Sequence, residues 1–463
     1  MSREKAFVHP YIPNSVPEVR EAMLREIGAR DVEELYAGIP DALRLKREMN
    51  LPKPLLSELE LRRHVEGLLR KNRSCQDYLN FMGGGCWQHF VPAVCDEIAS
   101  RAEFLTAYVG DTYSDLGKHQ AIFEFQSLMG ELLEMDVVSG PTYDWPSAAS
   151  SALLMASRLT GRKRVLVPAT TGPERLSHMR NFCRRAVSIE MVATEASSGL
   201  LDLQDLERKC GCETACVYLE NPTYLGLIER QGAEVAETAH SRGALFVVGV
   251  DPSSLGVLAP PATYGADLVC GEVQPLGLHM HFGGGVCGFI ASHDDPAIVG
   301  EYNTFLTSIA PTGREGEFGF GWSTMDRTSY VRRDASPDFM GSATNLWGIT
   351  AGVYLALLGP RGMRDLGEGI LQRRHYAMER LGAIKGLRTP VFSATHFKEF
   401  VVTFEGKAVQ DVNKALLERG IFGGIDLGGW FPELGNSALY CVTEVHTQGN
   451  IDHLADAVRE VLR

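Results

Sequence analysis

The sequence lacks long apolar runs, an excess of positive charge and paired cysteines. No segment approaches the uninterrupted run of about 20 apolar residues that spans a bilayer, and the first residues have no apolar core of signal-peptide length. With 45 Lys+Arg against 58 Asp+Glu, the formal charge is −13, which argues against nucleic acid because phosphate binding needs clustered positive charge. The 10 cysteines lack the paired spacing of a secreted scaffold. We therefore expect a cytoplasmic protein with no membrane and no nucleic-acid partner.

The composition is that of a globular protein large enough for several domains. The chain has 463 residues, 44% of them apolar and 22% charged, and domains of about 100 to 200 residues are typical. Between residues 15 and 71, apolar residues recur at helical spacing, and Ser57 followed by Glu60 fits a capping box that opens a helix. We expect a helical N-terminal arm over residues 1–75.

After Gly161, short apolar runs alternate with amphipathic segments. The runs that predict strands are 164–168, 186–192, 215–219, 245–250 and 266–269, and the segments that predict helices are 173–182, 203–209 and 232–242. Strands that alternate with helices build a mostly parallel sheet, and right-handed crossovers place helices on both faces. This predicts a large α/β domain over residues 76–335.

The C-terminal part has a different pattern. A long helical stretch from residue 345 to about 387 precedes a strand at 399–404, a helix at 409–418, a strand at 438–442 and a helix at 451–462. This order predicts a small α+β domain over residues 336–463.

One predicted strand ends in a carboxylate, Asp251. Ligands of open α/β sheets bind at the carboxyl ends of strands, so Asp251 either faces a ligand or caps the next turn. Such an Asp can pair with the protonated nitrogen of pyridoxal phosphate, but that cofactor also needs a lysine for its Schiff base. The chain has only eleven lysines, and none lies between Lys209 and Lys385, where the following strand and loop would place it.

Short motifs along nearly the whole chain resemble those of one family. In chain order they are residues 7–51, which include Ile-Pro-Asp-Ala-Leu-Arg at 39–44, and then 81–101, 103–108, 120–126, 221–222, 251–256, 264–269, 282–284, 354–360, 424–428 and 441–444. They resemble subunit 1 (alpha) of the two-subunit glycine dehydrogenase (decarboxylating), the P-protein of the glycine cleavage system. Each motif is short, but all occur in the family's order, so the chain is identified as a member of that family.

The resemblance implies a fold-type I architecture, that of the pyridoxal-phosphate-dependent transferases. It also implies that this chain is the alpha subunit without the cofactor lysine, and that a subunit-2-like beta chain carries the lysine and the pyridoxal phosphate. In the family's reaction an amino acid loses its carboxylate and an aminomethyl group passes to a lipoyl arm. A lipoyl H-protein-like carrier is therefore an expected partner, and the expected assembly is a hetero-oligomer, a heterotetramer.

Two segments depart from the family pattern. Residues 109–119 stand where the family has a Pro-Tyr-Gln…Ile-Ser-Gln-Gly segment, and residues 143–148 read Tyr-Asp-Trp-Pro-Ser-Ala instead of Tyr-Asp-Gly-Ala-Thr-Ala. Both segments are expected near the family's active site, whereas the scaffold motifs are kept. The substrate is therefore glycine or another amino acid or amine, and the departures motivate the hypothesis that it differs from glycine.

The loop that follows the next predicted strand carries candidate catalytic groups. His279 and His281, with Asp251, are the candidates for catalysis. On a strand the two histidines would share a face and could chelate a metal. We prefer the alternative that they line the crevice without a metal. The glycines that follow either approach a cofactor phosphate closely or form a tight turn: they are Gly283, Gly284 and Gly285.

Aromatic and basic side chains supply candidates for a substrate wall. Aromatic rings offer large contact area with a polar handle, although each is equally suited to a core. The candidates that line a substrate are His89, Tyr108, Tyr113, Tyr143, Trp145 and Arg333. Arg333 belongs to a group of arginines in residues 312–342, which either clamp a carboxylate or lie in a solvated interdomain loop.

Two other classes of function are open at this point. In one, the chain is a non-catalytic scaffold subunit, and replacing Asp251 or His281 leaves the rate of the complex unchanged. In the other, it is a stand-alone enzyme that does not use pyridoxal phosphate through a Schiff base and works with Asp251, His279 and His281. A fold resemblance does not choose between them, because chemistry belongs to the site.

Overall fold

The computed structural model describes most of the chain, in two compact units. The described residues are 8–9, 11–12, 15–47, 49–105, 116–284, 286–323, 325–338, 340 and 343–463. The two units are Met1–Arg73 and Ser74–Arg463. No described helix is both long and apolar enough to cross a membrane. The domain boundaries that the sequence suggests at residues 75 and 335 stay predictions.

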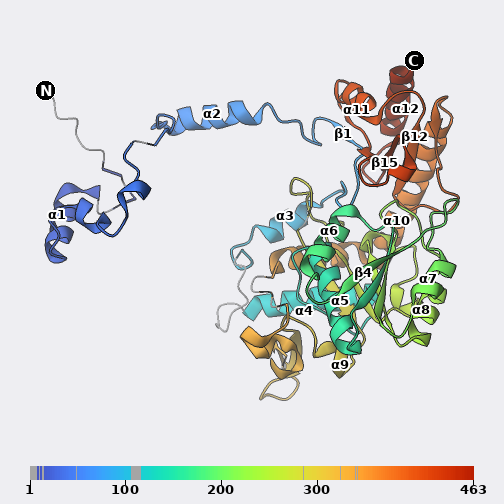
Figure 1. The fold of residues 1–463 in the computed structure, drawn as a ribbon, viewed down its shortest axis with the longest axis horizontal. Helices are drawn as coiled ribbons and strands as arrows, with labels where there is room; N and C mark the ends of the chain where they lie inside the picture. Colours follow the sequence, from blue (N-terminus) through green and yellow to red (C-terminus); the bar gives the residue numbers. More distant parts are fainter. Residues whose placement is uncertain are drawn as a thin grey trace. The chain divides into compact units, whose positions relative to one another are not determined.

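The first unit consists of short helices without a core (Figure 1). These are α1 (Pro17–Glu26), η2 (Val32–Tyr36), η3 (Asp41–Leu43) and α2 (Glu58–Leu69). The Ser57 hydroxyl accepts a hydrogen bond from the Glu60 backbone N–H at 3.3 Å, as the capping motif predicts. None of the described residues up to residue 73 is buried, including the apolar side chains of α1 and α2.

The second unit is built around a seven-stranded sheet in the order β2-β8-β7-β6-β5-β3-β4. The strands are β2 (Val137–Val138), β3 (Arg164–Pro168), β4 (Ser188–Val192), β5 (Thr214–Asn221), β6 (Leu245–Val250), β7 (Leu268–Glu272) and β8 (Gly288–Ser292). Neighbouring strands from β7 to β4 are parallel, and β8 is antiparallel to both of its neighbours. This confirms the predicted mostly parallel sheet. The sequence does not reveal β2, which has only two residues, or β8, which follows a Gly-rich turn.

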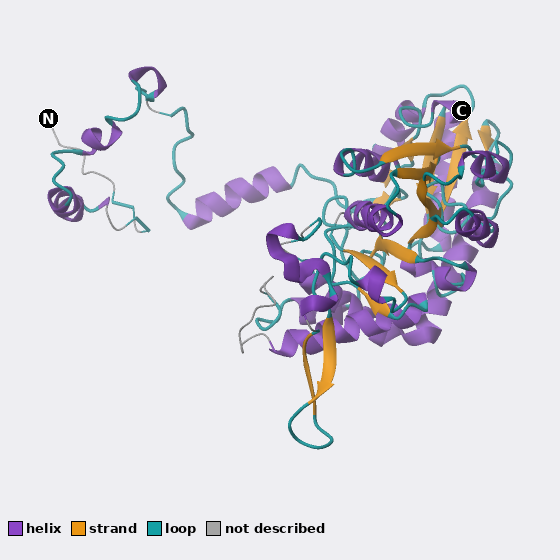
Figure 2. Cartoon of the chain, turned by 60° about the horizontal axis from the view of Figure 1, so that its bottom comes forward, coloured by secondary structure: helices purple, strands orange, loops and turns teal. Residues whose placement is uncertain are grey.

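Helices cover both faces of this sheet (Figure 2). One face packs against α5 (Trp145–Thr160) and α6 (Pro173–Phe182). The opposite face packs against α4 (Leu116–Leu133), α7 (Leu203–Lys209), α8 (Gly232–Ser241) and the first part of α10 (Asn345–Gly382). The pleat of β6 sends Val247 into the first core and Val248 into the second, so this strand is apolar on both sides.

A second, antiparallel sheet of four strands follows in the order β11-β12-β15-β14. Its elements are β11 (Leu387–Arg388), β12 (Glu399–Phe404), α11 (Val409–Leu417), β14 (Ile425–Asp426), η9 (Pro432–Leu434), β15 (Ser437–Cys441) and α12 (Gln448–Leu462). We call it the small sheet. α10 bends at Gly359, which has φ 59° and precedes Pro360, and its C-terminal part packs on the small sheet. One helix thus joins both cores.

The remaining short elements connect these layers. They are β1 (Leu79–Asn80), α3 (Ala93–Ala99), η5 (Pro252–Ser254), η6 (Pro261–Tyr264), α9 (Pro296–Val299), η7 (Met325–Arg327), η8 (Ser329–Ala335) and β13 (Ile421–Phe422). β1 pairs in parallel with β13, which ties residue 79 to the C-terminal part of the chain.

The start of the run at residues 312–342, for which the sequence leaves an interdomain loop open, forms the turn and the second strand of a β-hairpin (Figure 2). It pairs β9 (Thr307–Pro311) with β10 (Phe318–Trp322). In β10, Phe318, Phe320 and Trp322 alternate with glycine, a period of two that is typical of a strand. The high Gly and Ser content of the surrounding run hides this signal.

Candidate functional site

Three neighbouring parallel strands carry a buried carboxylate at their carboxyl ends. Glu220 lies near the end of β5, Asp251 directly follows β6, and Glu272 is the last residue of β7. A buried carboxylate is costly unless it is paired, hydrogen-bonded or protonated. The three carboxylates meet this requirement in different ways, and Asp251 and Glu272 line one crevice.

Asp251 caps a turn with one oxygen and holds an ion pair with the other. Oδ1 accepts hydrogen bonds from the Ser253 backbone N–H at 3.0 Å and from Ser253 Oγ at 2.8 Å, which opens η5. Oδ2 lies 2.6 Å from Lys398 Nζ. Asp251 therefore caps the turn and also presents a charged oxygen to the crevice, where a side chain of the same chain already pairs with it.

Lys398 is the residue immediately before β12, and its side chain is buried. Its Nζ lies 3.1 Å from His89 Nε2 and 3.3 Å from Ser253 Oγ. It also lies 3.6 Å from the centroid of the Trp87 ring, close enough for a cation–π contact. Lys398 thus carries a charge from the small sheet to the carboxyl end of β6.

The interactions continue from Lys398 to Glu444. An ammonium group can only donate, so His89 Nε2 is the acceptor and His89 Nδ1 carries the proton. Nδ1 lies 2.8 Å from Glu444 Oε2, and Glu444 Oε1 accepts from the Phe90 backbone N–H at 2.7 Å. Burial raises the pKa of Glu444, whereas its contact with His89 and the hydrogen bond from the Phe90 backbone N–H lower the pKa, with the net result that it lies below its ordinary value. Two anions and one cation are therefore connected through a histidine.

Glu272 has no cation paired with it among the described residues. Its oxygens accept backbone hydrogen bonds from Trp145 N–H at 3.3 Å and from Gln274 N–H at 3.2 Å, and the backbone of Cys287 contributes another. Burial raises the pKa of Glu272 to about 8, and the charge of Asp144 acts in the same direction. At neutral pH Glu272 is therefore mainly protonated and neutral.

Arg175, in the first turn of α6, neutralises the third carboxylate. Its Nε lies 2.6 Å from Glu220 Oε1 and its Nη2 2.8 Å from Glu220 Oε2, a bidentate pair. The guanidinium carbon is 4.1 Å from the Trp145 ring centroid. Trp145 in turn donates from Nε1 to Tyr218 Oη at 3.1 Å.

A glycine in β6 makes room for this arrangement. A Cβ atom at Gly249 would lie 2.5 Å from Tyr218 Oη and 2.8 Å from the Trp145 ring. The indole of Trp145 can therefore lie directly on the strand that ends at Asp251.

The crevice contains two adjoining spaces. The inner chamber, around Asp251, Lys398 and Trp87, has a volume of about 10 Å³, room for at most one water molecule. The outer chamber, lined by residues that include Asp144, Glu272 and Gly284, has a volume of about 200 Å³. Arg175 and Trp145 line both chambers and separate them.

The two candidate histidines lie outside both chambers. His279 Nε2 is 2.9 Å from Asp96 Oδ1, and both side chains are more than half exposed. His281 has φ 42° and its ring centroid lies 4.8 Å from that of Trp347. Burial lowers the pKa of His281, and the charge of His279 adds to this. Among the described residues, no group of three or more His, Cys, Asp or Glu side chains is arranged to hold a metal.

The other predicted site residues are distributed between the crevice and the surface. Trp145, Gly283 and Gly284 line the outer chamber, and His89 contacts Lys398. Tyr143 is largely exposed. Tyr108, Tyr113 and Gly285 lie outside the described residues, as does the side chain of Arg333.

Sequence reasoning misses the basic residues of the crevice. Lys398 lies beyond the lysine-free span between Lys209 and Lys385, and it reaches Asp251 from the small sheet. Arg175 stands on a correctly predicted helix, but nothing in the periodicity of that helix distinguishes it. In the sequence, the motif that contains Glu444 is informative only through its resemblance to the family, and its contact with His89 gives it a physical role.

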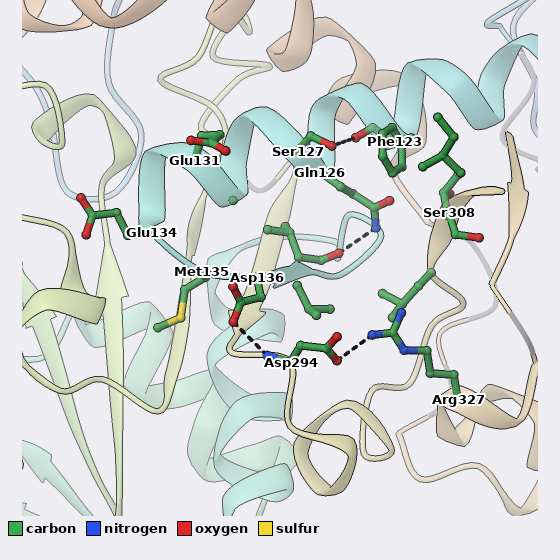
Figure 3. A pocket seen from close by; sticks show the side chains of 16 residues that line it. Phe123, Gln126, Ser127, Glu131, Glu134, Met135, Asp136, Asp294, Ser308 and Arg327 are labelled. Atoms are coloured by element: carbon green, nitrogen blue, oxygen red, sulfur yellow. Dashed lines mark hydrogen bonds and ion pairs between the residues drawn. The ribbon is translucent and has the colours of Figure 1, made fainter. Parts of the chain in front are cut away.

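A hollow larger than both chambers lies elsewhere (Figure 3). It has a volume of about 670 Å³ and lies between α4, β2 and β9. Gln126 Nε2 donates to the Val138 carbonyl oxygen at 2.7 Å, and Arg327 Nη2 donates to Asp294 Oδ1 at 2.6 Å. None of the three buried strand-end carboxylates lines it.

The sheet, the strand-end Asp and the small sheet that closes over it define the fold class. It is the fold-type I, pyridoxal-phosphate-dependent transferase-like fold. The structure of a sphingosine-1-phosphate lyase from Burkholderia pseudomallei superposes with a TM-score of 0.62 and 15% identity, covering 92% of this chain and 94% of that chain. At this identity the likeness concerns the fold alone.

Sequence similarity then places the chain within this class. Residues 9–458 match the family model for the glycine cleavage system P-protein, and the chain belongs to this family. A probable glycine dehydrogenase (decarboxylating) subunit 1 from Staphylothermus marinus is 39% identical, covering 98% of each chain. Another from Geobacillus kaustophilus is 36% identical, covering 97% of this chain and 98% of its own length. The crystal structure of a glycine decarboxylase (P-protein) of the glycine cleavage system, in inhibitor-bound form, superposes with a TM-score of 0.84 at 33% identity and covers 98% of this chain and 100% of that chain.

The crevice of this chain does not fit pyridoxal phosphate, the cofactor of the fold class. The pyridine nitrogen would have to displace Lys398 from Asp251, and the ring would need the space that Trp87 and Trp145 fill. A chamber of about 10 Å³ is far smaller than the several hundred Å³ of typical cofactor sites. We therefore derive no catalytic step from a cofactor bound to this chain.

Proposed function

We propose that this chain is the alpha subunit of a P-protein-type complex that decarboxylates an amino acid, and that a separate subunit-2-like chain carries the pyridoxal phosphate. Family membership supports the first part, since relatives that match over almost the whole length are named subunit 1. The observation that carries the second part is the buried pair between Asp251 and Lys398, 2.6 Å apart.

Lys398 is not a substitute for the missing cofactor lysine. In pyridoxal phosphate the ring nitrogen and the aldehyde carbon lie at opposite ends of the ring. A lysine that contacts the carboxylate partner of the nitrogen therefore cannot reach the aldehyde of a ring bound there. The side chain of Lys398 takes the place of the cationic nitrogen and leaves the Schiff-base position without a lysine.

The proposed roles of the two chains predict how the enzyme assembles. The complete enzyme would be a hetero-oligomer in the cytoplasm, a heterotetramer, that works with a lipoyl H-protein-like carrier. The departure at Trp145 supports a substrate different from glycine, because this bulky side chain stands in the crevice at the start of α5, where the family has glycine. The chain would then contribute shape to the assembly while the reacting groups are on its partner.

Co-expression with the subunit-2-like chain tests the division of labour. We expect both chains to elute together from a sizing column with the absorbance of bound pyridoxal phosphate, and this chain alone to elute without it after incubation with the cofactor. Cofactor binding by the isolated chain, or turnover without a partner, would contradict the proposal. Replacing the cofactor lysine of the partner is the matched control, and it should abolish the absorbance of the complex.

The substrate is tested on the same complex. We expect decarboxylation of glycine, with a lipoyl H-protein as acceptor, to be slower than for an ordinary P-protein, and another amino acid to be preferred. Equal rates with glycine would reject the altered substrate and leave the subunit assignment intact.

A further inference from the structure

One edge of the Arg175 guanidinium donates no hydrogen bond to the described residues. Its side chain is buried, with a relative exposure of 6% for the residue. Nε and Nη2 donate to Glu220, but among the described residues none accepts a hydrogen bond from Nη1. A guanidinium carries five N–H donors in a planar fork, so three of them are left over. Nη1 is not among the buried polar atoms that lack a partner, so this edge is one that water or a ligand can reach.

Aromatic rings restrict the guanidinium from the sides. The guanidinium carbon lies 4.1 Å from the Trp145 ring centroid and 5.6 Å from that of Tyr224. Glu220 occupies one edge of the guanidinium, and Nη1, on another edge, lies 3.2 Å from the position of a Cβ atom at Gly85, which lines the outer chamber as Arg175 does. A fixed, planar, partly dehydrated guanidinium is well suited to bind an oxyanion through two parallel hydrogen bonds.

The outer chamber has the size for a small ligand. Its volume of about 200 Å³ corresponds to about six or seven water molecules at roughly 30 Å³ each. Backbone forms part of its wall, because Gly84 and Gly284 have φ 78° and 89° and carry no side chain to fill the space. A molecule of a few heavy atoms can therefore reach Arg175 without displacing the inner ion pair.

The acidic side chains that line the outer chamber, Asp144, Glu174 and Glu272, differ in how they are held or screened. Glu272 is neutral in the pH range in which burial keeps it protonated. The Asp144 carboxylate is engaged at Oδ1, which accepts from the Ser147 backbone N–H at 2.7 Å and from Ser147 Oγ at 2.5 Å. Glu174 is exposed at the rim, where water screens it.

We propose that the outer chamber is a binding site for a small carboxylate-bearing molecule, held by the free edge of Arg175. The site is independent of which subunit carries pyridoxal phosphate, since it depends only on side chains of this chain. The crevice of this subunit thus binds a ligand although the subunit carries no cofactor.

Ligand-observed NMR on the full-length chain tests this site. The probes are acetate and glycine, both of which carry a carboxylate, and inorganic phosphate, which does not. We expect saturable binding of acetate and glycine with a Kd on the order of 1 mM, which is within reach of ligands this small.

Two variants and a control connect the binding to Arg175. The double variant Arg175→Met/Glu220→Gln removes the guanidinium together with its buried counter-ion, and it should weaken acetate binding at least about tenfold. In Gly172→Ala the new Cβ would lie 2.8 Å from the guanidinium carbon, so it displaces Arg175 without deleting a charge and should also weaken binding. Arg180→Met makes the same chemical change on the exposed side of α6 and should leave binding unchanged.

Three results would overturn the site. They are the absence of saturable acetate and glycine binding, binding of phosphate alone, and acetate binding that is equal in the wild type and in the Arg175→Met/Glu220→Gln variant. If the double variant does not fold, Gly172→Ala decides, and unchanged acetate binding in that variant rejects the proposal.

Discussion

The two chambers of the crevice share a wall but satisfy their charges differently. In the inner chamber Asp251 pairs with Lys398 and almost no free volume is left. In the outer chamber Glu272 is neutralised by a proton, and Arg175 keeps an edge without an acceptor among the described residues. In the inner chamber the carboxylate already pairs with a fixed cation of the same chain, so no charge is available to a ligand. In the outer chamber the carboxyl group is protonated and one edge of the guanidinium has no acceptor, so a ligand can bind.

The largest expected effect on stability concerns the ion pair between Lys398 and Asp251 in the inner chamber. Lys398→Met leaves the Asp251 carboxylate buried without its cation, and breaking a buried ion pair from one side costs about 3–5 kcal/mol. We expect this loss in the free energy of unfolding, measured by urea denaturation. The Asp251→Asn/Lys398→Met double variant removes both charges and should recover most of the loss. If single and double variants are equally unstable, the two charges do not compensate each other in the folded chain.

The second effect on stability concerns the proton on Glu272 in the outer chamber. The pKa of Glu272 is about 8 in the folded chain against an ordinary value of 4.5, so the unfolded chain loses this proton at lower pH. Between about pH 5 and pH 8 the contribution of Glu272 to the stability should therefore fall with rising pH, by on the order of 1 kcal/mol per unit. Above the folded pKa this contribution to the slope ends.

Denaturation of Glu272→Gln at several pH values measures that contribution. Relative to the wild type, the variant should lack the fall caused by Glu272. Glu399, whose pKa burial raises to about 7, contributes in the same direction as Glu272, and His396, whose pKa burial lowers to about 4, contributes in the opposite direction. A slope identical to that of the wild type would show that Glu272 is ionised in the folded chain.

The smallest effect is expected outside both chambers. The ion pair of His279 with Asp96 has both side chains about 60% exposed, and exposed pairs contribute at most about 1 kcal/mol. We expect His279→Ala to change the free energy of unfolding by no more than about 0.5 kcal/mol. A loss comparable to that of Lys398→Met would mean that the loop is buried in the working assembly.

The elements with strong periodicity could be predicted from sequence, and the site could be predicted only in part. The bounds of β3 and β6 agree with the prediction because their apolar runs end at Pro168 and before Asp251, and the start of α6 agrees because Gly172 and Pro173 mark it. Asp251 is recognisable by its position at a strand end. Lys398 is not, because no local pattern states which distant strand will close over β6. The roles of Arg175 and Glu272 depend on burial, which is a tertiary property that the sequence pattern does not reveal.

The long-range character of the crevice also sets the order in which the chain can mature. Lys398 is separated from Ser253 by 145 positions and from His89 by 309, and Glu444 is separated from His89 by 355. Contacts of such separation form late, after the strands they connect. During synthesis from the N-terminus, the sheet can be built while Asp251 is still hydrated, and the crevice can close only when almost the whole chain has left the ribosome.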